Sequence, residues 1–273
     1  MESIPAQTTY IEVPPPAALA DVVASFWEMR IPDSPETCVR ILPNACVDIV
    51  LYASEPSRGE GIARAVGPPH RSFVVGSTLR SFVARSAGPR QVIGASLLPC
   101  GVQPLLGVPA RIIGEVIVPL NDVIGSAAAR LEEQVLVGRE ALTLRRLAES
   151  LMHLRASRVT HSLVARAIAS VRWNGGRQRM DGLAHDHNVS TRQLERAFME
   201  HVGIGPKLFS RLVRFDRTVR DIPTRGTLPW SQFALTHGYS DQAHLINEVK
   251  LFAGVTPREV ERELLNGAIP PSA

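Results

Sequence analysis

An internal repeat in the carboxyl-terminal half constrains the fold more than any other feature of the sequence. Shifting residues 190–206 by 51 positions places residue types with the same structural role on top of one another. The aligned pairs are Ser190 with Asp241, Leu194 with Leu245, Phe198 with Val249, Gly203 with Gly254, and Pro206 with Pro257. Ser and Asp are good helix N-caps, apolar residues at i, i+4 and i+8 form one buried stripe, and Gly followed by Pro ends a helix. The repeat therefore predicts the same capped helix twice.

A short helix and a turn precede each copy of this helix. Ala184 and Ala234 each stand four residues before a turn residue, which is Asn188 in the first copy and Gly238 in the second. Both residue types tolerate the left-handed backbone conformation that a tight turn between helices needs. Each unit is thus predicted to be a helix-turn-helix motif.

A longer helix at about 207–222 is predicted to join the two units. Its apolar residues recur at helical spacing and form one buried stripe. They are Leu208, Leu212, Phe215 and Val219.

The charge is divided unevenly between the two parts of the chain. Residues 1–155 carry 14 Arg and no Lys against 15 acidic residues, whereas residues 156–273 carry 16 basic residues against 11 acidic ones. A basic region favours an anionic partner. A solvated basic surface would have the same composition, so the charge supports the motif without identifying the partner.

In a helix-turn-helix, the second helix enters the major groove of DNA and its first residues contact base edges. The outward positions of the two second helices are therefore the candidate DNA contacts. They are Thr191, Arg192, Gln193, Glu195 and Arg196 in the first unit, and Gln242, Ala243, His244, Ile246 and Asn247 in the second. Arg can pair with guanine, Gln with adenine, and Glu with cytosine.

One alternative interpretation of the second unit is a metal site. Asp241, His244 and Glu248 stand at i, i+3 and i+7, so a helix would place their oxygen and imidazole groups on one face. Capping by Asp241 and pairing of Glu248 with basic groups compete with this interpretation, and the upstream copy of the repeat has no such set. We predict no metal, cofactor or catalytic site.

The amino-terminal part has the pattern of a β-rich domain. Short segments rich in Val and Ile, separated by Gly, Pro and Ser, lie at 38–52, 71–77, 80–85 and 90–98. They predict a small antiparallel sandwich or barrel. From about 121 to 155, apolar residues recur every three or four positions and predict one or two helices with a break near Gly138.

The predicted fold class is α+β. An antiparallel β-rich domain at 1–125 is followed by a helical connector at 126–157. An all-α domain at 158–273 then carries two helix-turn-helix motifs joined by a long helix.

Localisation is predicted to be cytoplasmic. No apolar run approaches the roughly 20 residues that span a bilayer, and the first residues do not have the pattern of a secretion signal. Cys38, Cys46 and Cys100 have neither pairing nor zinc spacing, so they are predicted to be small core residues; a redox sensor is the alternative.

The carboxyl-terminal part resembles the DNA-binding domain of AraC/XylS-family transcription regulators. The segments "VSTRQLERAFMEHVGIGPKLF" and "FALTHGYSDQAHLINEVKLFAGVTPREV" carry the resemblance, which covers residues 158–263. By position it implies base contacts from Arg192, Glu195 and Arg196 in the first unit, and from Gln242, His244 and Asn247 in the second. The sequence departs from the family at Asn247, where Arg is frequent, and at Val249, where Phe is usual.

The amino-terminal part resembles a β-rich domain of unknown function that commonly precedes this kind of DNA-binding domain. The segments "ILPNACVDIVLY" and "LLPCGVQPLLGVPA" carry this resemblance, over about residues 10–125. It implies a receiver of a ligand or signal, with a cupin-like fold as one form.

The sequence thus predicts a sequence-specific, DNA-binding transcription regulator that responds to an effector. Its predicted partners are double-stranded DNA and a small-molecule effector, with homodimer formation and contact with RNA polymerase left open. One alternative is a small-molecule-binding or enzymatic module whose helices serve assembly; its catalytic set would be Asp48, Cys46, His70 and Cys100. Another is a regulator that has lost DNA binding and acts through protein contacts.

Overall fold

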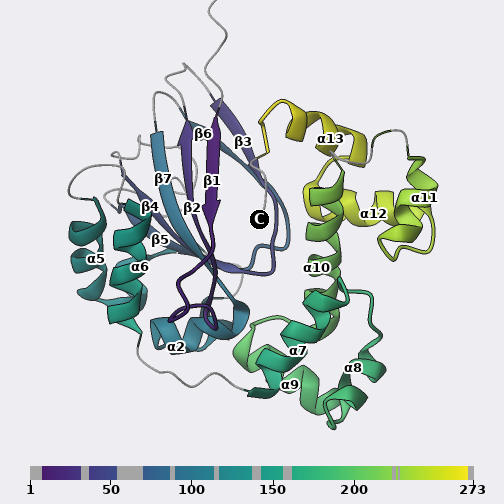
Figure 1. Cartoon of the computed structure of the whole chain (residues 1–273), viewed down its shortest axis with the longest axis horizontal. Helices are drawn as coiled ribbons and strands as arrows, with labels where there is room; N and C mark the ends of the chain where they lie inside the picture. Colours follow the sequence, from purple (N-terminus) through teal and green to yellow (C-terminus); the bar gives the residue numbers. More distant parts are fainter. Residues whose placement is uncertain are drawn as a thin grey trace, which may run out of the picture.

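The computed structural model describes residues 8–31, 37–53, 70–86, 90–113, 117–136, 143–155, 162–222, 226 and 228–269. Figure 1 shows a sheet-containing part, coloured purple to teal, beside a part built only of helices, coloured green to yellow. The predicted α+β class, with an antiparallel amino-terminal part and a helical carboxyl-terminal part, is confirmed.

The main element of the amino-terminal part is an antiparallel six-stranded sheet with the order β1-β2-β7-β4-β5-β8. Its strands are β1 (Thr9–Val13), β2 (Val23–Ile31), β4 (Val47–Tyr52), β5 (Ser72–Val75), β7 (Arg90–Leu97) and β8 (Ile117–Pro119). A second, two-stranded sheet pairs β3 (Thr37–Ile41) with β6 (Phe82–Ser86).

The two faces of the large sheet pack against different partners because side chains alternate along each strand. In β4, Val50 and Tyr52 contribute to a small apolar cluster shared with Val39 and Ile41 of β3. Ile49 and Leu51 point to the opposite face and join a larger cluster beneath helices. The described residues thus form two antiparallel sheets that share a small apolar cluster, where the sequence predicted a small antiparallel sandwich or barrel.

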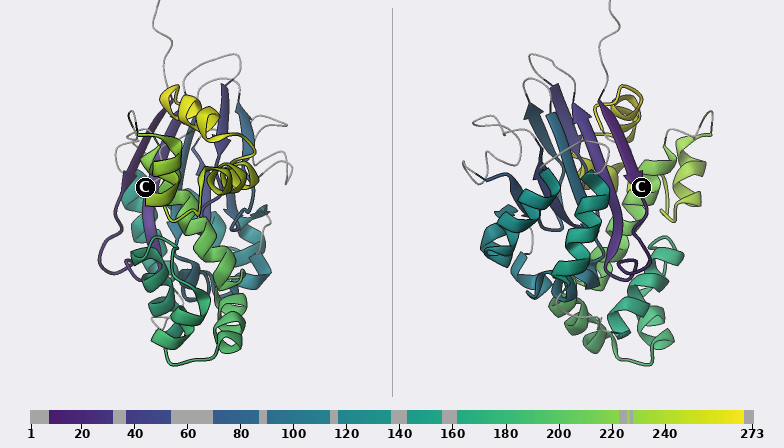
Figure 2. Two further views of the ribbon diagram at one scale, coloured as in Figure 1. Left: turned by 90° about the vertical axis from the view of Figure 1, so that its right-hand side faces the viewer. Right: turned by 60° about the vertical axis from the view of Figure 1, so that its left-hand side comes forward.

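Two helices that the sequence assigned to a connector cover that opposite face. They are α5 (Ala127–Leu136) and α6 (Thr143–Leu154), and Figure 2 shows them lying along the sheet. Leu131, Val135, Leu147 and Leu151 belong to the same buried cluster as the sheet residues. These helices therefore complete the core of the amino-terminal part. The predicted break near Gly138 lies outside the described residues.

The helical part contains both predicted helix-turn-helix units and the predicted joining helix, flanked by α7 (Ser162–Trp173) and α13 (Pro257–Leu265). The first unit has α8 (Met180–Asp186) and α9 (Thr191–His201), the joining helix is α10 (Pro206–Asp221), and the second unit has α11 (Trp230–Thr236) and α12 (Gln242–Ala253). Figure 1 shows α10 running between the two units, with α8 and α9 toward one end and α11 and α12 toward the other. Leu212, Phe215 and Val219 of α10 are buried as predicted, while Leu208 is partly buried.

Several elements were not predicted from the sequence. Strands β1 and β2 lie before residue 38, where no strand was expected. Two short helices, α2 (Val102–Leu106) and α3 (Ala110–Ile113), follow β7. A third, α4 (Leu120–Ile124), lies at the start of the segment that was predicted to be helical. No helix in the described ranges combines the length and apolar character needed to cross a membrane.

The three cysteines are unpaired and differ in exposure. Cys46 and Cys100 are buried, as predicted, but Cys38 is exposed on the two-stranded sheet, so the core assignment is wrong for that residue. Burial raises the pKa of the Cys46 thiol to about 12 and also raises the pKa of Cys100. These two thiols are therefore protonated near neutral pH, which disfavours thiolate chemistry.

Candidate nucleic-acid interface

The first helix-turn-helix unit consists of α8, a turn at Asn188, and α9. Asn188 has a φ of 55°, the left-handed conformation that the sequence predicted. Ser190 caps α9 by accepting a hydrogen bond from the backbone N–H of Gln193 at 3.2 Å. Leu194 and Phe198 are fully buried against the core of the helical part. This packing leaves the opposite face of α9 exposed.

The second unit repeats this arrangement with α11, a turn at Gly238, and α12. Gly238 has a φ of 77°. The Asp241 carboxylate accepts a hydrogen bond from the backbone N–H of His244 at 2.7 Å, and Leu245 and Val249 are buried. The repeated cap, apolar stripe and turn are therefore confirmed in both units. We refer to α9 and α12 as the reading helices.

The segment between α7 and α8 packs against both α10 and the second unit. A Cβ on Gly176 would lie 2.0 Å from the carbonyl oxygen of Ser210 in α10, so only glycine allows this approach. The Arg177 side chain that follows crosses to the turn of the second unit, where a Cβ on Gly238 would lie 2.4 Å from Arg177 Cγ. Gly176 thus lets the chain pack on α10, and the Arg177 side chain touches the second unit.

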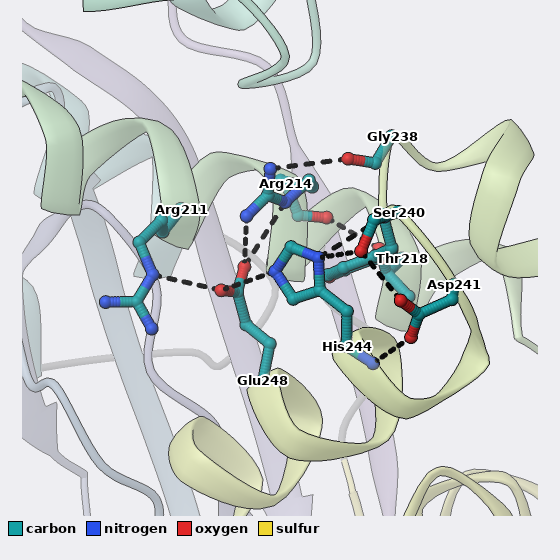
Figure 3. A network of polar contacts seen from close by, with 9 residues as sticks. Arg211, Arg214, Thr218, Gly238, Ser240, Asp241, His244 and Glu248 are labelled. Atoms are coloured by element: carbon teal, nitrogen blue, oxygen red, sulfur yellow. Dashed lines mark hydrogen bonds and ion pairs between the residues drawn. The ribbon is translucent and has the colours of Figure 1, made fainter.

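A buried carboxylate fastens the second reading helix to α10. Glu248 of α12 is 4% exposed, and its Oε1 accepts a hydrogen bond from Arg214 Nη2 at 2.7 Å. Its Oε2 accepts one from Arg211 Nε at 3.0 Å. Figure 3 shows the carboxylate between the two guanidinium groups. Pairing of Glu248 with basic groups was predicted, whereas its burial was not.

Tyr239 extends this network into the core. The Arg214 guanidinium carbon lies 4.8 Å from the centre of the Tyr239 ring, and the Tyr239 hydroxyl lies 3.2 Å from the Thr218 hydroxyl. Burial is the main cause that raises the pKa of Tyr239 to about 12. The phenol is therefore neutral, and the charge of Arg214 is balanced by Glu248.

His244 lies beside this network. The backbone N–H of Ser240 donates to His244 Nδ1 at 3.3 Å, and Nε2 lies 3.8 Å from Glu248 Oε2. Figure 3 shows the ring turned toward Ser240 and Glu248. The sequence had placed this ring toward a DNA groove. In the fold the His244 ring is partly exposed and contacts Ser240, just before the start of α12.

The metal interpretation of Asp241, His244 and Glu248 does not fit these contacts. Asp241 is engaged as a cap, and the backbone N–H of His244 is the main cause that holds the pKa of the Asp241 carboxyl below its usual range. Glu248 is neutralised by two arginines. No cluster of three or more His, Cys, Asp or Glu in the described ranges is arranged to hold a metal ion.

A cleft of about 940 Å³ lies between the two reading helices. Three predicted contact residues line it, namely Glu195 of α9 and His244 and Asn247 of α12. The cleft thus brings together predicted positions from both units. Its other lining residues belong to the segment 176–179, to the first two residues of α8, Met180 and Asp181, and to α10.

The remaining predicted contact residues lie outside the cleft lining. Thr191, Arg192, Gln193, Arg196 and Gln242 are all exposed on the reading helices. Gln193 is partly engaged, because its Oε1 accepts a hydrogen bond from the backbone N–H of Ser190 at 2.8 Å. Ile246, assigned outward from the sequence, is instead partly buried against the core.

Sequence reasoning missed a set of basic residues around the cleft. They are Arg177, Arg179, Lys207, Arg211 and Arg214. These residues belong to the segment before α8 and to α10, outside the reading helices. The only signal in the sequence was the excess of basic residues after position 155.

Two separate segments of the chain match known protein families. Residues 11–119 match the family model of a domain of unknown function (DUF6597), and residues 183–263 match the model of a helix-turn-helix domain. No curated protein matches the chain.

Solved structures of regulators are similar to parts or most of the chain. An AraC-type transcriptional regulator from Chromobacterium violaceum is 24% identical, with 37% of this chain and 91% of that chain covered and a TM-score of 0.35. The C-terminal domain of AraT, a response regulator from Geobacillus stearothermophilus, is 23% identical, with coverage of 39% and 88% and a TM-score of 0.36. ToxT from Vibrio cholerae is 12% identical, with coverage of 94% and 98% and a TM-score of 0.46.

Proposed function

Because the chain carries an AraC-type helix-turn-helix domain behind a domain of unknown function, we propose that it is a sequence-specific DNA-binding transcription regulator responsive to an effector. The observation that carries the proposal is the pair of capped reading helices that lie on either side of one cleft. Two such helices on one chain suit two successive major-groove faces of a duplex, about 34 Å apart.

The exposed residues of each reading helix supply the proposed base contacts. In α9, Thr191, Arg192, Glu195 and Arg196 are exposed, and the arginines can donate two hydrogen bonds to guanine. In α12, Gln242 and Asn247 are exposed and carry amides that can pair with adenine. The ring of His244 and the amide of Gln193 would contact bases only after releasing their hydrogen bonds with Ser240 and Ser190.

Selection from a random pool of duplexes tests this function. We expect the purified full chain to enrich a site with two conserved parts whose centres are separated by about one helical turn, or roughly 10 base pairs. Enrichment of no sequence over the starting pool would contradict sequence-specific binding. Mapping of bound sites in the cell would then identify the regulated genes and show whether the protein acts on chromosomal DNA in the cytoplasm.

Contacts between the amino-terminal part and the second unit support the proposed response to an effector. Arg40 of β3 pairs with Glu263 of α13 at 2.6 Å, and both side chains are mostly buried. The Ser81 backbone N–H donates to the carbonyl of Phe252 at 2.8 Å, and its hydroxyl donates to the carbonyl of Ala253 at 2.6 Å. Phe252 and Ala253 are the last residues of the second reading helix.

The first unit has a contact of its own with the amino-terminal part. Arg111 of α3 pairs with Glu200 of α9 at 3.2 Å, and a Cβ on Gly203 would lie 3.2 Å from the carbonyl oxygen of Ala110. Both reading helices therefore touch the same amino-terminal part. A ligand that changes the conformation of the amino-terminal part can therefore change the positions of the two reading helices. Allosteric coupling requires such a difference in contacts between the two states.

A ligand screen followed by DNA titration tests the effector proposal. A compound that binds the folded protein raises its melting temperature by mass action. An effector would also change the affinity for the selected duplex, and the duplex would change the affinity for that compound by the same factor. The Arg40→Ala plus Ser81→Ala variant should show weaker coupling between the two ligands. Ligands that stabilise the protein yet leave duplex affinity unchanged would speak against this role.

A further inference from the structure

We propose that the cleft between the two reading helices binds the sugar–phosphate backbone of DNA at the minor groove that separates the two major-groove contacts. This inference rests on the proposed function and assigns a role to residues outside the reading helices. It concerns affinity and register rather than the reading of bases, because backbone contacts carry no direct sequence information.

The position of the cleft is the first reason. Glu195 lines it from α9, and His244 and Asn247 line it from α12. When two helices occupy successive major grooves on one face of a duplex, the groove between them on that face is the minor groove with its two phosphate strands. The surface between the helices must therefore meet phosphate.

The charge of the lining is the second reason. Five basic side chains and three acidic ones line the cleft, the acidic ones being Asp181, Glu195 and Glu248. Two of these acids are already balanced within the protein, because Asp181 pairs with Arg179 and Glu248 with Arg211 and Arg214. The lining keeps a net positive charge for an anionic partner.

Lys207 is the basic residue best placed for this role. It is exposed, and within the part of the chain that the structure describes it makes no hydrogen bond or ion pair. It follows Pro206 in the first turn of α10, where a positive charge opposes the helix dipole and is locally unfavourable. Neither helix stability nor an internal partner accounts for a cation at this position.

Arg177 and Arg211 are held in place at the edge of the cleft by the fold. Arg177 donates to the carbonyl oxygens of Asn174 and Thr236 at 3.3 and 3.4 Å. Both acceptors are neutral, so these contacts do not balance the charge of its guanidinium group. Arg211 uses Nε for Glu248 and remains one-third exposed. A side chain that is already ordered loses less conformational entropy when it binds phosphate.

The first test measures the salt dependence of DNA binding. Lys207→Ala combined with Arg177→Ala removes two exposed charges from the cleft, and Arg130→Ala on α5 removes one exposed charge from the amino-terminal part. We expect the double variant to weaken binding to the selected duplex and to an unrelated duplex of equal length by the same factor. Its slope of log K against log salt should fall by about 0.9 for each phosphate that the variant no longer neutralises. The Arg130→Ala variant should keep the wild-type slope.

The second test locates the contact on the DNA. Methylphosphonate linkages remove the phosphate charge and can be placed either at the central minor groove of the selected duplex or beyond its ends. Central substitutions should weaken wild-type binding more than they weaken binding by the double variant. Equal weakening for both proteins, an unchanged salt slope, or an effect confined to the selected duplex would each overturn the inference.

These outcomes separate the inference from the proposed function. If the wild-type protein selects a two-part site while the double variant keeps its salt slope, only the backbone role of the cleft fails. If the wild-type protein enriches no site and binds duplexes without salt dependence, the proposed function itself fails.

Discussion

Glu248 and Arg214 form a buried ion pair that ties the second reading helix to the helix joining the two units. Glu248 Oε1 and Arg214 Nη2 are 2.7 Å apart, with side-chain exposures of 4% and 14%. Both groups have lost most of their hydration, so each depends on the other. The orientation of α12 is thereby coupled to α10, and through α10 to the first unit.

Glu248→Ala is expected to destabilise the protein strongly. Removal of the carboxylate leaves the buried Arg214 charge uncompensated, which typically costs about 3–5 kcal/mol. Chemical denaturation followed by circular dichroism measures the change. The matched control is Glu149→Ala, which removes an exposed partner of Arg145 and should change stability by less than about 1 kcal/mol. Similar losses of stability for the two variants would contradict the structural role of Glu248.

Gly238→Ala is expected to destabilise the second unit. Its φ of 77° disfavours any side chain by roughly 1–2 kcal/mol, and the new Cβ would also meet the Arg177 side chain. Gly182→Ala is the control, because Gly182 lies within α8 with open space around it and should gain up to about 1 kcal/mol. Thermal unfolding of both variants should give opposite shifts, and a gain at both positions would refute the proposed constraint.

The cap of the second reading helix should give stability a measurable dependence on pH. The folded-state pKa of Asp241 is held below the ordinary value of about 3.9. Its contribution is therefore present above that ordinary value and is lost as the pH falls through the lower folded value. Asp241→Asn keeps a capping oxygen but cannot titrate. The wild-type advantage over this variant should shrink below about pH 4, and a constant difference across this range would argue against the assignment.

The helical units were predictable because their signals are local. Ser190, Asn188, Gly238 and Asp241 act on backbone atoms within a few residues, so spacing alone indicated the caps and turns. Strand β2 was missed because it contains the good helix formers Ala24, Glu28, Met29 and Arg30. One of its two pairing partners, β7, also lies 59 to 74 residues later, from the pair Ile31 and Arg90 to the pair Val23 and Leu97. The local sequence of a strand gives little indication of a pairing partner that is distant along the chain.

The orientations of the side chains in the site could not be predicted from the sequence. His244 and Gln193 both stand at outward helical positions. Yet the His244 ring contacts Ser240, just before its helix, and the Gln193 amide contacts the cap Ser190. The burial of Glu248 depends on Arg211 and Arg214 from a helix 34 to 37 residues earlier. Rotamers and distant partners of this kind follow from packing rather than from periodicity.

Arg192→Ala and Arg196→Ala are expected to relax the DNA sequence preference. If each arginine contacts a base, each substitution should cost about 1–3 kcal/mol on the selected site and less on an unrelated duplex. Competition titrations with single-base variants of the site measure this change. Arg130→Ala, on the amino-terminal part, serves as the charge control. Equal weakening on all sequences would reassign these arginines to backbone contact.

We propose that two reading helices, held at a fixed separation by α10, bind one face of a duplex. The most direct test compares the affinity for the selected site with that for the same site carrying about 5 additional base pairs between its two parts, which is half a helical turn. We expect the insertion to lower the affinity to that of a duplex with only one part intact. Unchanged affinity after the insertion would contradict binding by two helices at a fixed separation.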